Sequence, residues 1–187
     1  MRSESITGII LAGGNSSRFG TDKTQYLLNG KRLINYSIEV LLPVCDEIII
    51  STNKPEDYIN DAYQTVIDKF INCGPLGGIF SSLVKSKTEH NLIIGCDMPN
   101  LCTDLFRKIL INKNGYDVVM PVHHGHTETL ASYFNKSALN TLENAILNKK
   151  YKITDAIAGL NTIFFDVSDF DFYNIDLFKN INIKEDI

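Results

Sequence analysis

Long apolar runs are missing from this 187-residue chain. No stretch approaches the roughly 18 consecutive apolar residues that indicate a membrane-spanning helix, so we expect no membrane partner. The N-terminal Met1–Ser5 leads into an apolar stretch that is too short for the core of a secretory signal. The four cysteines include no CxxC pair, which argues against a redox motif or a zinc knuckle. These absences together predict a cytoplasmic protein with reduced thiols.

Basic residues are in the minority, with 18 Lys and Arg against 22 Asp and Glu and a net charge of −4. Binding to a nucleic-acid backbone usually needs a basic face, so we expect no nucleic-acid partner, whereas a small anionic ligand needs only a few cations. Repeats, low-complexity tracts and Pro/Gly/Ser linkers are absent as well. The length and the 44% apolar content therefore predict a single domain over residues 1–187.

Apolar, β-rich runs alternate with helical patterns along the chain. Strands are expected at Ile6–Leu11, Glu47–Thr52, Asn91–Cys96, Tyr116–Met120, Leu130–Phe134 and Thr162–Val167. Helices are expected at Arg32–Leu42, Leu76–Val84, Thr103–Asn112 (capped by Thr103), Ser137–Leu147, Ile153–Ala158 and, briefly, from Asp176. The alternation predicts an α/β fold, a three-layer, mostly parallel sheet with helices on both faces. Ligands of such sheets bind beyond the carboxyl ends of the strands, where Gly13–Lys23, Asn53 and Asp97 fall.

A glycine-rich segment, LAGGNSSRFGTDK, directly follows the first expected strand. Gly13 and Gly14 allow a tight turn, and the free N–H groups of such a turn form a concave site for an anion. Arg18 can grip phosphate oxygens as a fork, and Lys23 adds a point charge. The spacing fits neither the P-loop nor the dinucleotide fingerprint. The segment predicts a triphosphate site; the alternative is a plain glycine turn with a solvated arginine and lysine.

Two later segments support this prediction. Asp97, in GCDMP, follows an expected strand and offers the kind of oxygen ligand that Mg²⁺ prefers, although an aspartate there can also simply cap a helix or turn. The run GPLGGI at Gly74–Ile79 predicts a sharp turn into a helix that begins near Pro75. The small residues Gly77 and Gly78 would permit close packing against a nucleotide or against a neighbouring strand.

These motifs resemble those of the nucleotidyltransferases that make molybdenum cofactor dinucleotides. The family signature reads roughly LAGGxSxRMGxDK, from which the chain departs at Phe19; the family also has CDxP and GPLAGI motifs. The Gly13-Gly14 pair resembles the GTP-using branch, the molybdenum cofactor guanylyltransferases, because members of the related group that use CTP usually carry LAAG. The resemblance implies a Rossmann-like nucleotidyltransferase fold.

The resemblance also implies roles for individual residues. The nucleotide would contact the loop at Leu11, Ala12, Gly13, Gly14 and Lys23, and Asp97 would bind Mg²⁺. Asn53 and Asp68 would lie in the guanine site, although for Asn53 a plain turn is an equal alternative.

The acceptor side is expected in the later part of the chain. Segment 125–133 resembles a family stretch that carries a glutamate or similar polar residue before Pro-Leu and an aromatic-ended strand, with Thr129 in place of the proline. The tail NINIKED resembles a family ending in which two asparagines, here Asn180 and Asn182, are associated with a pterin; the alternative is an ordinary polar tail. The cluster of His123, His124 and His126 matches no zinc spacing, which favours a surface loop.

Together with these features, the resemblance implies transfer of GMP from GTP to the phosphate of molybdopterin, with release of pyrophosphate. Lys23 would hold the α-phosphate, Arg18 the departing phosphates and Asp97 the Mg²⁺ ion, with an N-terminal nucleotide-binding part and a C-terminal acceptor-binding part. Cofactor-delivery proteins and recipient molybdoenzymes are candidate partners. The alternatives are a related enzyme that uses CTP or a sugar phosphate, and a non-catalytic nucleotide-sensing module.

Overall fold

The computed structural model of the chain describes residues 4–13 and 26–181. Eight strands form one sheet in the order β10-β7-β9-β6-β1-β4-β5, with β8 paired to β7. The strands are β1 (Ile6–Leu11), β4 (Glu47–Ser51), β5 (Gln64–Val66), β6 (His90–Gly95), β7 (Val118–His123), β8 (His126–Thr127), β9 (Ala131–Asn135) and β10 (Thr162–Asp166). The strands β2 (Leu27–Leu28) and β3 (Lys31–Arg32) form a separate hairpin.

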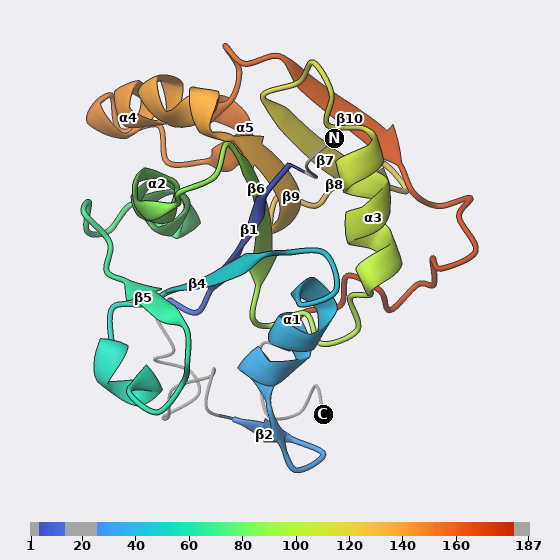
Figure 1. Cartoon of the computed structure of the whole chain (residues 1–187). Coiled ribbons are helices and arrows are strands. Elements are labelled where there is room, and N and C mark those ends of the chain that lie inside the picture. The colour runs from blue at the N-terminus through green and yellow to red at the C-terminus, as the bar shows by residue number, and fades with distance from the viewer. Residues whose placement is uncertain (1–3, 14–25, 182–187) are drawn as a thin grey trace.

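Helices cover both faces of this sheet, as Figure 1 shows. They are α1 (Leu33–Leu41), α2 (Pro75–Lys85), α3 (Thr103–Ile111), α4 (Leu139–Leu147) and α5 (Ile153–Ala156), with 3₁₀ turns η3 (Pro55–Tyr58) and η4 (Lys136–Ala138). One core cluster lies between the sheet and α1 and α3, and includes Ile38 and Phe106. The other lies beneath α2, α4 and α5, and includes Leu76 and Leu142. The expected three-layer, mostly parallel α/β fold is confirmed.

Strand β1 lies at the centre because its side chains are apolar on both faces. It pairs in parallel with β4 on one side and β6 on the other. Ile9 and Ile10, which point to opposite faces, are both fully buried. A strand that is covered on both faces by helices needs such a continuous apolar run.

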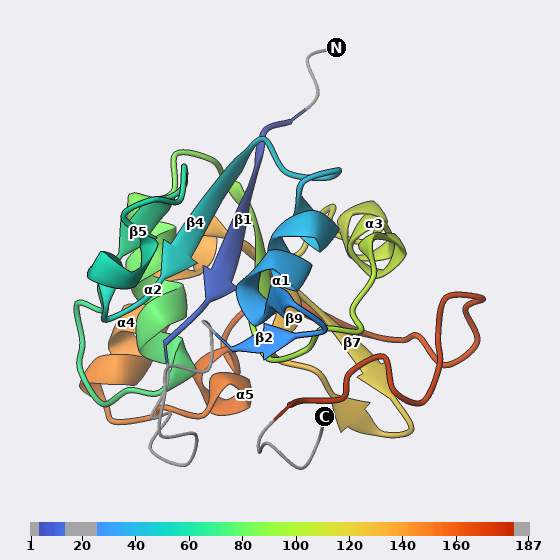
Figure 2. The same ribbon diagram turned by 90° about the horizontal axis from the view of Figure 1, so that it is seen from below.

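Strand β9 runs antiparallel to both of its neighbours, β6 and β7. The two reversals leave β7 parallel to β6, so the carboxyl ends of β1, β4, β5, β6 and β7 meet at one edge of the sheet. Figure 2 shows β1 and β4 running side by side toward this edge. The term carboxyl edge is used for it below.

Two expectations about helices are wrong. Thr103 does not cap α3: Cys102 takes the N-cap position with an extended backbone, and the Thr103 hydroxyl instead donates a hydrogen bond to the Val40 carbonyl at 2.9 Å. This bond ties α3 to α1. From Asp176 to Ile181 the chain makes turns and forms no helix. Within the described ranges, no helix is long and apolar enough to cross a membrane.

Candidate nucleotide-binding site

The central strands end level with one another at the carboxyl edge. Leu11 of β1 pairs with Ser51 of β4 and with Gly95 of β6. The Ala12 N–H donates to the Ser51 carbonyl at 2.8 Å, and the Cys96 N–H donates to the Leu11 carbonyl at 3.2 Å. The glycine-rich segment therefore leaves the sheet between the segments that carry Asn53 and Asp97. The register thus brings Leu11, Ala12 and Gly13 to the edge where a ligand is expected.

Four of the residues predicted to bind the substrates lie outside the described residues. Gly14, Arg18 and Lys23 fall in segment 14–25, and Asn182 falls in segment 182–187. Their roles stay predictions.

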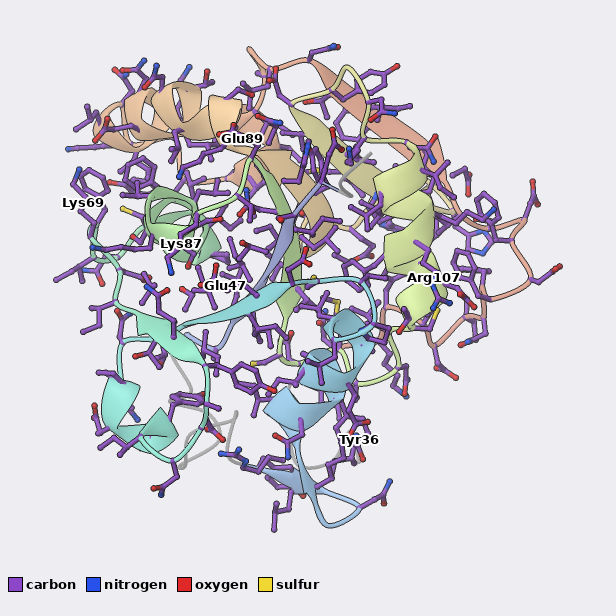
Figure 3. All side chains as sticks on the ribbon, viewed as in Figure 1. Tyr36, Glu47, Lys69, Lys87, Glu89 and Arg107 are labelled. Atoms are coloured by element: carbon purple, nitrogen blue, oxygen red, sulfur yellow. The ribbon has the colours of Figure 1, made fainter. Side chains whose placement is uncertain are left out.

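The chain that follows the glycine-rich segment is fixed to α1. The Leu33 N–H donates to the Tyr26 carbonyl at 3.0 Å, and the Tyr36 hydroxyl donates to the Leu28 carbonyl at 3.0 Å. Figure 3 shows Tyr36 on the side of α1 nearest the β2–β3 hairpin. Contacts with α1 therefore fix the position of residues 26–28, which follow the glycine-rich segment.

Asn53 and Asp68 form a reciprocal pair beyond the ends of β4 and β5. The Asn53 side-chain amide donates to Asp68 Oδ2, and the Asp68 backbone N–H donates to Asn53 Oδ1, both at 3.2 Å. Burial raises the pKa of the Asp68 carboxyl, while hydrogen bonds from Asn53 and Ser51 oppose the rise. A fixed carboxylate beside an amide can accept and donate hydrogen bonds at the edge of a nucleobase.

Helix α2 packs closely against this pair through two glycines. A Cβ atom at Gly78 would lie 2.6 Å from Ser51 Oγ and 3.4 Å from Asp68 Oδ1, and one at Gly77 would lie 2.8 Å from the Phe70 carbonyl. Of the two possibilities that the sequence left open, these contacts favour packing against a neighbouring strand. The turn at Gly74, with φ of 59°, and the helix start at Pro75 are as expected.

Asp97 follows β6 in a turn and is partly buried. Its side chain folds back, so that a Cβ atom at Gly95 would lie 3.0 Å from Asp97 Oδ1. Its carbonyl accepts a hydrogen bond from the Ile181 N–H at 2.8 Å, and the buried Ile181 packs against Leu33. The exposed Asn180, predicted to bind the acceptor, is therefore adjacent to a residue that is bonded to Asp97.

The surface-loop expectation for the histidines is right for His124 and His126 and wrong for His123. His124 is exposed in the turn between β7 and β8 and His126 is exposed at the start of β8, whereas His123 ends β7 with a side chain only 15% exposed. Its Nε2 lies 2.8 Å from Glu128 Oε1, and its ring stacks on Phe178 with centroids 4.7 Å apart. The histidine spacing alone carried no sign of this pairing, because it depends on strand register and on the returning tail.

Asp97 could contribute one carboxylate ligand to a metal at this edge. Residues 4–13 and 26–181 contain no group of three or more His, Cys, Asp or Glu side chains that could hold a metal. One or two carboxylates completed by substrate phosphates are the usual environment of Mg²⁺ in enzymes of nucleotide chemistry. Asp97 at the carboxyl edge fits that arrangement.

A mostly parallel sheet, with a glycine-rich segment after its central strand and a carboxylate after the adjacent strand, fits the Rossmann-like nucleotidyltransferase fold. Residues 8–162 match the MobA-like NTP transferase domain, and the chain belongs to this family. This confirms the resemblance drawn from the three motifs. Nucleotidyltransferases of this kind generally use a divalent metal ion.

Relatives match the chain over nearly its full length. It is 32% identical to a probable molybdenum cofactor guanylyltransferase of Natranaerobius thermophilus, over 98% of this chain and 94% of the relative. It is 30% identical to the molybdenum cofactor guanylyltransferase of Desulfosudis oleivorans, over 98% and 93%. The crystal structure of molybdopterin-guanine dinucleotide biosynthesis protein A from Archaeoglobus fulgidus superposes with a TM-score of 0.80 at 27% identity, over 96% of this chain and 94% of that one.

Proposed function

We propose that this protein transfers GMP from GTP to the terminal phosphate of molybdopterin and releases pyrophosphate, giving a guanine dinucleotide cofactor. The observation that supports the proposal is the level register of β1, β4 and β6, which brings the start of the glycine-rich segment at Ala12–Gly13, Asn53 and Asp97 to one edge. The names of the full-length relatives supply the identity of the nucleotide and the acceptor.

The strand order suggests how GTP lies along the edge. Asp68 follows β5 and Asp97 follows β6, with β4 and β1 between them. Three strand spacings separate them by roughly 14 Å, a span that suits an extended nucleotide from its base to its phosphates. Guanine would meet Asn53 and Asp68, the triphosphate would lie over the loop that begins at Ala12, and the reacting phosphorus would lie near Asp97.

The reaction needs positioning more than a protein nucleophile. An acceptor phosphate oxygen attacks the α-phosphorus in line, the bond to the bridging oxygen breaks, and pyrophosphate leaves with the bonding electrons. Lys23 would hold the α-phosphate and Arg18 the departing phosphates by charge-assisted hydrogen bonds. Mg²⁺ held by Asp97 and the substrate would supply charge neutralisation at the phosphate oxygens. Backbone N–H groups of the glycine-rich turn would orient the same oxygens.

The setting of the activity is part of the proposal. The whole chain would act as one domain in the cytoplasm, where its four free cysteines would stay reduced. Because the product is a cofactor, a protein that delivers molybdopterin or a molybdoenzyme that receives the dinucleotide would dock near the carboxyl edge.

The test is incubation of the protein with molybdopterin and the magnesium salt of GTP, CTP or UTP, with detection of the product by mass. A guanine dinucleotide made from GTP alone is expected. Asp97→Ala should bind GTP but turn over at least about a hundredfold more slowly, because one preorganised charge typically contributes about 3 kcal/mol. A cytosine dinucleotide, or turnover of folded Asp97→Ala close to that of wild type, would overturn the proposal.

A further inference from the structure

The pair formed by His123 and Glu128 lies at the same carboxyl edge as Asp97. Val118 of β7 pairs with Phe134 of β9, which pairs with Asn91 of β6. Because β9 is antiparallel to both neighbours, β7 and β6 run in the same direction, and their carboxyl ends carry His123 and, just beyond β6, Asp97. Strand β9 lies between β7 and β6 in the sheet. The nucleotide residues lie on the other side of Asp97, along β1, β4 and β5.

The Glu128 carboxylate is held in a fixed orientation. Its Oε1 lies 2.8 Å from His123 Nε2, and its side chain is 21% exposed. His123 is itself restrained, with Nδ1 3.3 Å from the Tyr173 hydroxyl and its ring stacked on Phe178. Within the described part of the chain, no hydrogen bond reaches Glu128 Oε2. A half-buried, oriented carboxylate with an available oxygen is suited to binding a ligand that carries N–H donors.

Two connections link this pair to Asp97. Along the tail, Phe178 stacks on His123 and Ile181 donates its N–H to the Asp97 carbonyl, with the exposed Asn180 between these two anchors. Along the sheet, the Gly95 N–H donates to the Leu130 carbonyl at 2.8 Å, two residues after Glu128. Asp97, Asn180 and Glu128 therefore border one stretch of the carboxyl edge.

We propose that Glu128, oriented by His123, binds the adjacent N–H groups of the pterin ring of the acceptor. The proposal rests on the proposed function, which makes a pterin the acceptor. The pyrimidine half of a pterin carries a ring N–H next to an exocyclic amino group, and a carboxylate accepts from two such donors side by side. Asn180 adds an amide that can donate to the ring carbonyl or accept from an N–H. His123 is a positioning residue.

The first experiment measures steady-state turnover of Mg-GTP with molybdopterin by Glu128→Gln. The KM for molybdopterin should rise at least tenfold, whereas kcat and the KM for GTP should stay within twofold of wild type. The matched control is Glu47→Gln at the amino end of β4, where Glu47 is 28% exposed and lies 3.8 Å from Lys87 (Figure 3). All three constants of the control should stay within twofold. An unchanged KM for molybdopterin in folded Glu128→Gln would overturn the proposal.

His123→Gln tests whether His123 acts by orienting the Glu128 carboxylate. It should raise the KM for molybdopterin less than Glu128→Gln does, and should add little when combined with it, because both changes act on one interaction. Fully additive effects would show that His123 acts elsewhere and would overturn its positioning role.

A second measurement needs no variant and no turnover. Fluorescence titration compares a pterin monophosphate with the matching lumazine, in which an oxygen replaces the amino group. Wild type should prefer the pterin at least tenfold, and an equal affinity would overturn the assignment of Glu128 even if Glu128→Gln failed to fold. Absence of any guanine dinucleotide from wild type would instead defeat the proposed function, whatever the titration gave.

Discussion

Asp68 combines a position in the proposed nucleotide site with an unfavourable environment. Burial raises the pKa of its carboxyl, so the folded protein holds this proton more tightly than the unfolded chain does. Stability is then lost as pH rises through the raised pKa, because ionisation costs more in the folded state. A carboxylate that costs stability at neutral pH is the kind of residue that a ligand-binding role retains.

Asp68→Asn should therefore stabilise the protein while it weakens nucleotide binding. Above the raised pKa the variant should melt a few degrees higher than wild type, and the difference should shrink as pH falls toward the ordinary aspartate value of about 3.9. Loss of a charge-assisted hydrogen bond should lower GTP affinity about tenfold. Thermal melts across the pH range and calorimetric GTP titration measure the two effects.

Asp155→Asn provides the control for this prediction, because Asp155 is exposed on α5, which Figure 1 shows apart from β5. It should bind GTP as wild type does. A drop in the melting temperature of Asp68→Asn at neutral pH, together with unchanged GTP affinity, would contradict both halves of the prediction.

At the scale of an element, α2 depends on its glycines to reach the sheet. A methyl group at Gly78 would lie 2.6 Å from Ser51 Oγ and 3.2 Å from Leu11 Cδ2. Ser51 is buried and hydrogen-bonded to Asp68, so it has little room to move away. The closeness of this helix keeps the Asn53–Asp68 pair in position.

Gly78→Ala should destabilise the protein, although alanine favours a helix by about 1 kcal/mol. Overpacking of a tight interface costs about 1–3 kcal/mol, so we expect a net loss of about 1 kcal/mol in the free energy of unfolding and weaker GTP binding. Urea denaturation measures the first. Gly159→Ala is the matched control, since its new Cβ would meet only Thr141 Cγ2, at 3.9 Å. Equal stability of the two variants would show that the interface between α2 and the sheet can accommodate an added methyl group.

The elements also show which parts of the structure could be predicted from sequence. β1 and β6 were predicted because both are apolar on each face, and a buried parallel strand requires that. β5 was missed because its three residues, Gln64–Val66, are too few for any periodicity. The strand at Leu130–Phe134 was expected, but its antiparallel direction depends on pairing with β6 and β7, which no local pattern encodes.

The candidate site likewise has a part that could be predicted from sequence and a part that could not. Asn53 and Asp97 could be located because the carboxyl ends of parallel strands meet at one edge. The contact of Phe178 with His123 joins residues far apart in the chain, through a tail without regular structure. Short-range patterns therefore indicate the nucleotide side better than the acceptor side.

Across the whole molecule, strand order sets the proposed binding groups along one edge. β5 and β4 carry the pair expected to bind the base, β1 leads into the glycine-rich segment, β6 carries Asp97, and β7 carries His123. The tail crosses from β7 back to β6, with Phe178 on His123 and Ile181 on Asp97. Residues 178–181 thereby border the proposed acceptor half of the edge.

Removal of residues 179–187 should weaken acceptor binding and leave nucleotide binding nearly unchanged. A chain ending at Phe178 loses the buried Ile181, which costs about 2 kcal/mol, but keeps the strands that hold Asn53, Asp68 and Asp97. We expect GTP affinity within a few-fold of wild type and a KM for molybdopterin at least tenfold higher. A chain ending at Ile181 keeps Asn180 and the bond to Asp97. Its KM for molybdopterin should therefore lie between that of wild type and that of the chain ending at Phe178. Its difference from wild type measures what residues 182–187, including Asn182, contribute to acceptor binding. If the chain ending at Phe178 showed the wild-type KM for molybdopterin, the tail would have no part in acceptor binding; if it lost GTP instead, the nucleotide half of the edge would depend on the tail.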